Sequence, residues 1–278
     1  MDSQLQPNLR SQGWNLRVID HCQYGDILSQ YIAGSTLNVI AKQFNVWPTT
    51  ISCILRKQGV QCRTSKYSYN KTFFSVIDTP DKAYFLGLMF TDGNVEHNGR
   101  TAKITLQIQD AYILDEFASR IFIGSRPHLY HDDHDYKKFN GRRQAKRVLK
   151  MSCGPLVQDL IRLGCVPAKS LSLHFPVALL RNREVLWHFM RGLFDGDGSL
   201  SLARGKYLNV TYVGSHYLVK AIWVVLRQYG FRSTVFNCGK FSRLRVFSDS
   251  IRPMLTLMYK DSKGLRLERK HNRYVTYA

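Results

Sequence analysis

Apolar residues recur at helical spacing in three successive groups within residues 26–63. Gly34 ends the first predicted helix, and the Ser35 hydroxyl can cap the second by accepting a free backbone N–H. Asn45 begins a tight corner, and Pro48 suits the first turn of the third helix because its missing N–H has no partner there. The pattern predicts a small all-α domain with the apolar positions Ile27, Leu28, Tyr31, Ile32, Leu37, Ile40, Ala41, Phe44, Ile51, Ile54 and Leu55.

Two longer helical patterns farther along the chain, residues 84–95 and 189–200, repeat each other. When they are aligned, Asp92 falls on Asp197, an offset of 105 residues (197 − 92). Strand-like runs, an amphipathic helix, a basic hairpin and a closing helix follow each copy in the same order. The sequence therefore predicts an α+β fold in which two similar units occupy residues 79–181 and 182–278.

The two repeated helices are expected to end at glycine, because glycine takes the left-handed backbone conformation at little cost. Asp92 and Asp197 then lie in the last turn, where the helix dipole is already negative and a carboxylate needs a compensating cation. Small residues would let the two helices approach backbone to backbone and bring both aspartates to one end. This geometry predicts a divalent metal site, and the glycines concerned are Gly87, Gly93, Gly192, Gly196 and Gly198.

The charge of the chain points to a polyanionic partner. Its 278 residues include 40 Lys and Arg against 20 Asp and Glu, a net charge of +20. Nucleic acid is the first candidate, because each neutralised phosphate releases a counterion, and an anionic membrane surface is the second. No apolar run approaches the roughly 20 residues that cross a bilayer, which weakens the membrane alternative.

Cysteine usage and the first residues indicate an intracellular protein. The six cysteines form no C-x-x-C pair, so we expect reduced thiols rather than a zinc site or a disulfide framework. Residues 1–13 lack the apolar core of a secretion signal. Residues 1–25 are expected to form a partly flexible N-terminal segment.

The three-helix pattern of residues 26–63 resembles a helix-turn-helix of the resolvase-like kind. Small Ala41 would let two helices cross closely and place the third in a major groove, although Trp47 stands where Ser or Thr is frequent. A plain three-helix bundle without DNA contact is the alternative. The resemblance implies DNA contacts from Thr49, Thr50, Ser52, Arg56 and Lys57.

Residues 64–78 are predicted to link this domain to the repeat. They interleave basic Lys66 and Lys71 with aromatic residues, among them Tyr67, Phe73 and Phe74. Such a segment suits a strand that lies along DNA through phosphate contact and stacking. It equally suits a tether that docks on the following domain.

Both copies of the repeated helix, within residues 72–278, closely resemble the LAGLIDADG motif of homing endonucleases. The resemblance implies two pseudo-symmetric αββαββα units in one chain, with sheets that form a saddle for the DNA major groove. It places the metal-binding positions on Asp92–Gly93 and Asp197–Gly198. The first acid of the consensus is Asp195 in copy two but Phe90 in copy one, a position that is not the essential ligand in the family.

The resemblance further implies a monomeric, site-specific endonuclease that cuts both strands of a long double-stranded DNA target. Mg²⁺ or Mn²⁺ suits two carboxylates completed by phosphate oxygens and water. The family adds a lysine and a glutamine near each scissile phosphate. The candidate lysines are Lys169 and Lys263, with Lys270 competing for the second place, and the candidate amides are Gln107 and Gln109.

The strands and hairpins of both units are expected to contact the DNA target. Arginine and glutamine can pair with base edges, whereas lysine mostly contacts phosphate. The acidic and histidine-rich run 131–135 looks like a metal site, but nothing fixes its ligands, which favours a polar hairpin tip. The predicted DNA-contacting residues are Lys103, Gln107, Arg142, Arg143, Lys146, Arg204, Lys206, Arg243 and Arg245.

Two other functions remain open on the same scaffold. One is a maturase that binds its own intron RNA, and the other is a transcription regulator that has lost the nuclease. Intact Asp92 and Asp197 disfavour the regulator, and the helix-turn-helix favours DNA over RNA. Enzymes of this kind usually serve intron homing, an intein or a free-standing element, and the lack of flanking splicing-domain sequence disfavours the intein.

Overall fold

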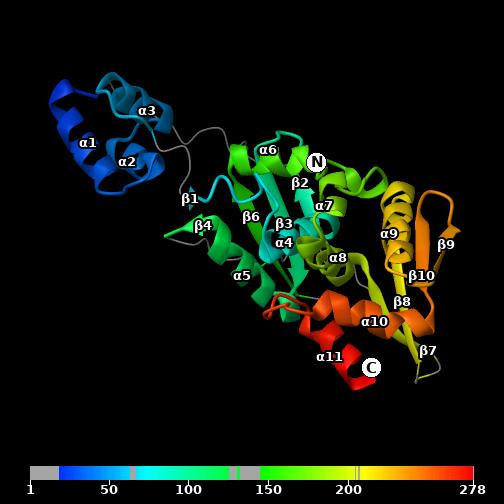
Figure 1. Ribbon diagram of the computed structural model, residues 1–278. Coiled ribbons are helices and arrows are strands. Elements are labelled where there is room, and N and C mark those ends of the chain that lie inside the picture. Colours follow the sequence, from blue (N-terminus) through cyan, green and yellow to red (C-terminus); the bar gives the residue numbers. More distant parts are fainter. Residues whose placement is uncertain are drawn as a thin grey trace, which may run out of the picture. The chain divides into compact units, whose positions relative to one another are not determined.

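The computed structural model describes residues 19–62, 67–124, 130–131, 145–203, 205 and 207–277. Contacts divide the chain into two compact units, Met1–Lys66 and Tyr67–Ala278 (Figure 1). Residues 1–18 of the predicted N-terminal segment lie outside the described residues. Among the helices that are described, none combines the length and the apolar character needed to cross a membrane. All six cysteines are free thiols.

Unit 1 packs helices around a small apolar core. Ile27, Ile40 and Ile51 are fully buried in it. The hydroxyl of Thr36, rather than that of the predicted Ser35, caps the second helix by accepting the N–H of Val39 at 3.3 Å. The chain turns after this helix through a left-handed Asn45, with φ of 54°. The elements are a 3₁₀ turn η1 (His21–Gln23), α1 (Tyr24–Ile32), α2 (Leu37–Phe44) and α3 (Pro48–Lys57).

Unit 2 contains the same order of elements twice. In the first half these are α4 (Pro80–Thr91), β2 (Gly93–Val95), β3 (Thr101–Gln107), η2 (Ile108–Asp110), α5 (Tyr112–Ile121), β5 (Tyr130–His131), β6 (Lys146–Ser152) and α6 (Gly154–Arg162). The turn η3 (Lys169–Leu171) and helix α7 (Val177–Arg181) lead to the second half. It consists of α8 (Arg183–Asp197), β7 (Ser199–Ala203), β8 (Tyr207–Gly214), α9 (His216–Gln228), β9 (Ser233–Asn237), β10 (Ser242–Val246), α10 (Ser248–Tyr259) and α11 (Glu268–Tyr277).

The two sheets have the same topology, which confirms the predicted duplicated α+β fold. The first has strand order β2-β3-β6-β5 and the second β7-β8-β10-β9, with antiparallel neighbours in both. Side chains alternate between core and surface with the period of two that a sheet imposes. In β10, Leu244 and Val246 are buried, whereas Arg243 and Arg245 are exposed.

The segment 67–78 packs against unit 2 through its buried residues Tyr69, Phe73, Phe74 and Ile77, while Lys71 and Val76 are exposed. Strand β1 (Ser68–Tyr69) pairs with β4 (Phe122–Ile123). Phe74 is fully buried and contacts Phe117 edge to face, with ring centroids 6.0 Å apart. The aromatic residues of this segment therefore dock on the protein.

Candidate active site

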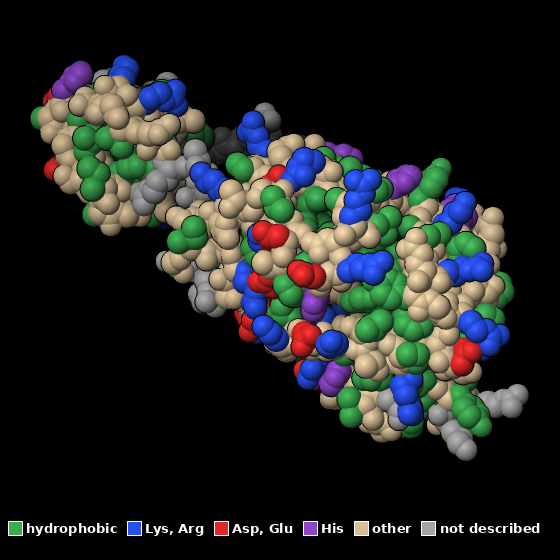
Figure 2. All heavy atoms as spheres, viewed as in Figure 1, with side chains coloured by type: hydrophobic (Ala, Val, Ile, Leu, Met, Phe, Trp, Pro, Cys, Tyr) green, Lys and Arg blue, Asp and Glu red, His purple; other side chains and the backbone are tan. Residues whose placement is uncertain are grey.

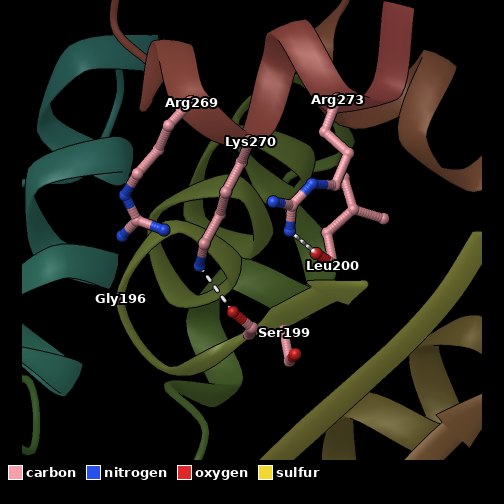
Figure 3. Close-up of a pocket in the computed structure, with 7 residues that line it drawn as sticks. Gly196, Ser199, Leu200, Arg269, Lys270 and Arg273 are labelled. Carbon is pink, nitrogen blue, oxygen red and sulfur yellow. Dashed lines mark hydrogen bonds between the residues drawn. The ribbon is translucent and has the colours of Figure 1, made fainter. Parts of the chain in front are cut away.

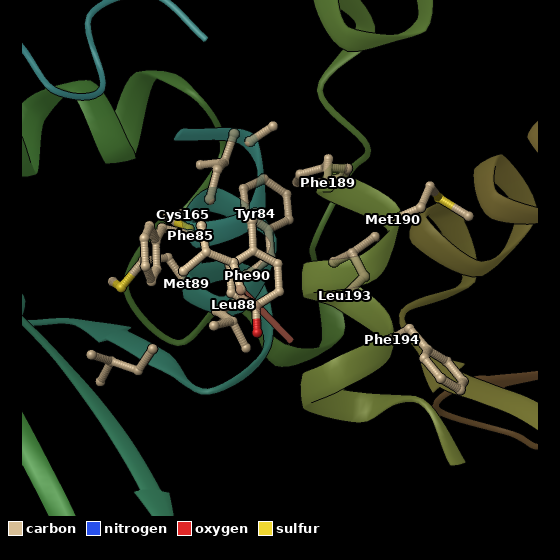
Figure 4. Close-up of a cluster of buried hydrophobic side chains, with 14 of the residues drawn as sticks. Tyr84, Phe85, Leu88, Met89, Phe90, Cys165, Phe189, Met190, Leu193 and Phe194 are labelled. Carbon is tan, nitrogen blue, oxygen red and sulfur yellow. The ribbon is translucent and has the colours of Figure 1, made fainter. Parts of the chain in front are cut away.

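Helices α4 and α8 cross so closely that only glycine fits at their contact. A Cβ atom on Gly87 would lie 2.5 Å from the carbonyl oxygen of Phe189 and 2.8 Å from Cα of Gly192. A Cβ on Gly192 would collide with the backbone of Tyr84. Both helices are buried along most of their length, and their large side chains spread on either side of the crossing (Figure 4).

The crossing brings the carboxyl ends of the two helices together. Asp92 caps α4, and Asp197 is the last residue of α8. A Cβ atom on Gly196, the neighbour of Asp197, would lie 2.7 Å from Oδ2 of Asp92. The predicted juxtaposition of the two aspartates is therefore present in the fold.

Glycine follows each aspartate for a different reason than the sequence suggested. Neither Gly93 nor Gly198 takes a positive φ, and Gly198 is extended at φ of −72°. A Cβ on Gly93 would lie 2.7 Å from Cα of Met89, and one on Gly198 would lie 2.8 Å from Cα of Phe194. Space beside the preceding turn, and not the left-handed conformation, requires glycine at these two positions.

The surroundings of both carboxylates disfavour their ionised form, chiefly because the groups are withdrawn from solvent. Burial and, to a smaller extent, the charge of Asp197 raise the pKa of Asp92 to about 6, although Lys270, the Thr91 hydroxyl and Lys169 act in the opposite direction. Burial also raises the pKa of Asp197, against the charges of the same two lysines. Asp197 remains accessible to solvent. A cation bound between the carboxylates would relieve this cost.

Two buried lysines lie at the ends of the motif helices, one from each half. Lys169 donates to the carbonyl of Gly93, at the end of α4. Lys270 donates to the carbonyls of Phe194 and Asp195 at 2.5 and 2.7 Å, and to that of Gly198 at 2.5 Å. A cation at a helix C-terminus is stabilised by the helix dipole.

The structure corrects the pairing of the lysines, because Lys270 and not Lys263 is the counterpart of Lys169. Lys263 is exposed in a left-handed turn with φ of 47°. The distance in sequence between each lysine and the glycine of its motif could have indicated this pairing. Lys169 follows Gly93 by 76 residues and Lys270 follows Gly198 by 72, whereas Lys263 follows Gly198 by 65 (263 − 198).

The donors at this site fit a hard divalent cation. Among the described residues, no group of three or more His, Cys, Asp and Glu side chains converges on one point. Asp92 and Asp197 supply carboxylate oxygens only, which suits Mg²⁺ or Mn²⁺ with water and phosphate completing the shell. Zinc, which favours four nitrogen and sulfur ligands, does not fit.

Asp195, the first acid of the second motif, points into the core and away from this pair. Its Oδ2 accepts the Tyr84 hydroxyl and the N–H of Leu267, both at 2.9 Å. The Tyr84 ring lies under the guanidinium of the fully buried Arg191, 5.0 Å from its centroid. Asp195 therefore ties the two motif helices and the C-terminal segment together.

Basic side chains occupy the outer faces of both sheets, where the register aligns them. Lys103 of β3 lies opposite Lys150 of β6, and Gln107 lies opposite Lys146. Arg245 of β10 pairs with Thr211 in the second sheet. Lys and Arg side chains are spread over the visible face of unit 2 (Figure 2). Arg142, Arg143, Arg204, Lys206 and residues 132–135 lie outside the described residues.

The predicted DNA-contacting residues of α3 divide into two groups. Thr49, Arg56 and Lys57 are exposed. Ser52 is engaged internally, since its hydroxyl lies 3.3 Å from Sγ of Cys62 and accepts from Arg56 at 3.5 Å. Thr50 is partly buried. Of the candidate amides, Gln109 is exposed and donates to the Gln107 side chain at 2.8 Å.

Several solved structures are similar to this chain. The homing endonuclease I-WcaI bound to its DNA recognition sequence has 12% identity and a TM-score of 0.48, with 79% of this chain and 96% of that chain covered. I-DmoI in complex with DNA and Mn has 15% identity and a TM-score of 0.40, with 68% and 98% covered.

Full-length DUF199/WhiA from Thermatoga maritima has 14% identity and a TM-score of 0.42, with 74% of this chain covered. This chain spans 64% of the length of that protein. No family model and no curated protein matches the sequence. The duplicated order of elements within the chain, rather than these distant likenesses, carries the fold assignment.

Proposed function

We propose that this protein is a site-specific double-strand DNA endonuclease that hydrolyses phosphodiester bonds with a divalent cation. The observation that carries the proposal is the meeting of Asp92 and Asp197 at the crossing of α4 and α8, with a buried lysine beside each helix end. Because one chain carries both halves of the site, we propose that it acts as a monomer.

The residues of the site would have different roles in hydrolysis. Asp92 and Asp197 would hold the cation, which when bound supplies an activated water and neutralises charge at the phosphate. Lys169 and Lys270 keep positive charge beside the carboxylates, which helps the carboxylates to remain ionised. The crossing glycines fix the separation of the two aspartates, because the backbones of the two helices are already in contact and a wider spacing would break that contact.

Two surfaces would bind the target. The outer faces of the sheets carry Lys103, Lys146, Arg243 and Arg245, which suit phosphate oxygens and base edges. The exposed residues of α3 in unit 1 add a second DNA contact of the helix-turn-helix kind. The net charge of +20 supports binding to a polyanion such as a long DNA duplex.

Incubation with a library of long duplexes, with Mg²⁺ or with EDTA, tests the proposal. We expect linear products with short 3′ overhangs at one sequence, formed only with the cation. Asp92→Asn and Asp197→Asn should abolish them, whereas Asp115→Asn, on the exposed side of α5, should not. Cleavage that persists in both site variants would refute the proposal.

A further inference from the structure

The two lysines of the site are not equivalent, because Lys270 has no hydrogen-bond donor left. A lysine ammonium carries three N–H donors. Those of Lys270 meet three carbonyls, of Phe194, Asp195 and Gly198. Lys169 bonds one carbonyl among the described residues, that of Gly93. Lys169 can therefore also donate to a substrate oxygen, whereas Lys270 is committed to the end of α8.

A basic pocket of about 230 Å³ lies beside Lys270. Gly196 and Gly198, the neighbours of Asp197 in the chain, form part of its wall. Arg269 and Arg273 lie four residues apart on one face of α11, and their side chains extend with that of Lys270 toward the turn between α8 and β7 (Figure 3).

Both arginines are anchored by one nitrogen and keep others for a ligand. Nε of Arg269 donates to Oδ2 of Asp110 at 3.0 Å, which offsets part of its charge. Nη1 of Arg273 donates to the carbonyl of Leu200. Because a guanidinium has five N–H donors in a planar fork, each anchored group retains the geometry that suits a phosphate.

The residues that flank the lysine differ between the two halves of the site. Aligning Lys169 with Lys270 places Ala168 at the position of Arg269 and Ser172 at that of Arg273 (169 − 1 and 169 + 3). At these aligned positions the first half therefore has no arginine, and its lysine keeps donors that bond no described residue. The second half offers a saturated lysine with two arginines.

We propose that Arg269 and Arg273 form a phosphate-binding seat that positions one strand of the DNA beside Asp197, with no arginine at the two aligned positions of the first half. The inference rests on the proposed nuclease function and deepens it. Arg273, whose charge no described carboxylate offsets, is the main positioning residue. Different side chains consequently hold the two DNA strands, and cleavage of only one of the two strands depends on α11.

A strand-specific cleavage assay tests the seat. The cut site mapped with the wild-type protein is placed in a duplex with a separate end label on each strand, and single-turnover rates are measured with Mg²⁺. In Arg273→Ala we expect the rate for one strand to fall by about tenfold or more, the loss of a charge-assisted hydrogen bond, while the other strand changes little. Nicked duplex should then accumulate.

Two further variants separate positioning from general damage. Arg252→Ala removes the same charge from the exposed surface of α10 and should leave both rates unchanged. Arg273→Lys keeps the charge without the fork, and we expect an intermediate loss on the same strand. Equal slowing of both strands, or no slowing in either arginine variant, would overturn the seat while leaving the nuclease intact. A wild-type protein that cuts neither strand would refute the nuclease, and the seat with it.

Discussion

The hydroxyl of Tyr84 donates to the buried carboxylate of Asp195 at 2.9 Å and so joins α4 to α8. The offset of 105 residues relates this pair to Phe189 and Phe90 (84 + 105 and 195 − 105). Those two rings meet edge to face, with centroids 5.3 Å apart. The pseudo-symmetric helix pair is thus held by a polar contact on one side and by an aromatic contact on the other.

Removal of the buried Tyr84 hydroxyl should destabilise the protein more than removal of an exposed tyrosine hydroxyl. In Tyr84→Phe the buried Asp195 carboxylate keeps the N–H of Leu267 but loses its other donor, so we expect a loss of about 1.5–3 kcal/mol in the free energy of unfolding. Urea denaturation measures it. Tyr217→Phe, at a side chain that is 60% exposed, should change little. Equal stability of the two variants would show that the Tyr84 hydroxyl contributes nothing.

Neutralising Asp92 should abolish cleavage yet stabilise the cation-free protein. The folded-state pKa of Asp92 is about 6 against an ordinary 3.8, so ionisation costs folding energy at high pH. We expect Asp92→Asn to raise the free energy of unfolding by about 1–3 kcal/mol at pH 8 in EDTA.

The sign of this effect gives the Asp92 prediction a pH signature. Below pH 6 the folded carboxyl takes up a proton, so the advantage of the asparagine should shrink and vanish near the unfolded pKa of 3.8. Thermal melts of both proteins from pH 4 to pH 8 follow it. An advantage that is constant with pH would argue against a pKa of Asp92 raised by burial and by the charge of Asp197.

A methyl group at the helix crossing should disrupt unit 2. Alanine at Gly87 places its Cβ 2.5 Å from the Phe189 carbonyl, which is backbone and cannot move aside. We expect Gly87→Ala to cost more than about 3 kcal/mol, or to prevent folding, as over-packing does at rigid sites. Gly154→Ala, where nothing lies within 4 Å, is the matched control. Circular dichroism and denaturant titration compare them, and a folded Gly87→Ala of normal stability would contradict the close crossing.

Unit 1 should add sequence-independent affinity for DNA through α3. Arg56 and Lys57 are exposed at the end of this helix. If both contact phosphates, replacing them with alanine should weaken binding at low salt and reduce the slope of log K against log salt by about 0.9 per contact. Lys42→Ala, on the exposed side of α2, provides the control. Fluorescence anisotropy with one labelled duplex measures the binding constant at each salt concentration. An unchanged slope would show that Arg56 and Lys57 do not contact DNA phosphates.

The order of elements was readable from the sequence because it depends on local periodicity and on a repeat. Apolar spacing predicted the helices and strands of both halves, and the offset between Asp92 and Asp197 predicted the duplicated motif. Pro48 marked the start of α3 for a reason confined to one turn of helix.

Only the tertiary structure decided which distant residues complete the site. Lys270 reaches the end of α8 from 72 residues away, and Asp195 reaches Leu267 across the same distance. Gly93 and Gly198 are required by the volume of a neighbouring turn, which no local conformational preference reveals. The aromatic rings of Tyr69, Phe73 and Phe74 pack in the hydrophobic core of unit 2. Such contacts depend on how segments far apart in the sequence pack against one another. The pattern of apolar and polar residues predicts each segment separately and does not predict this packing.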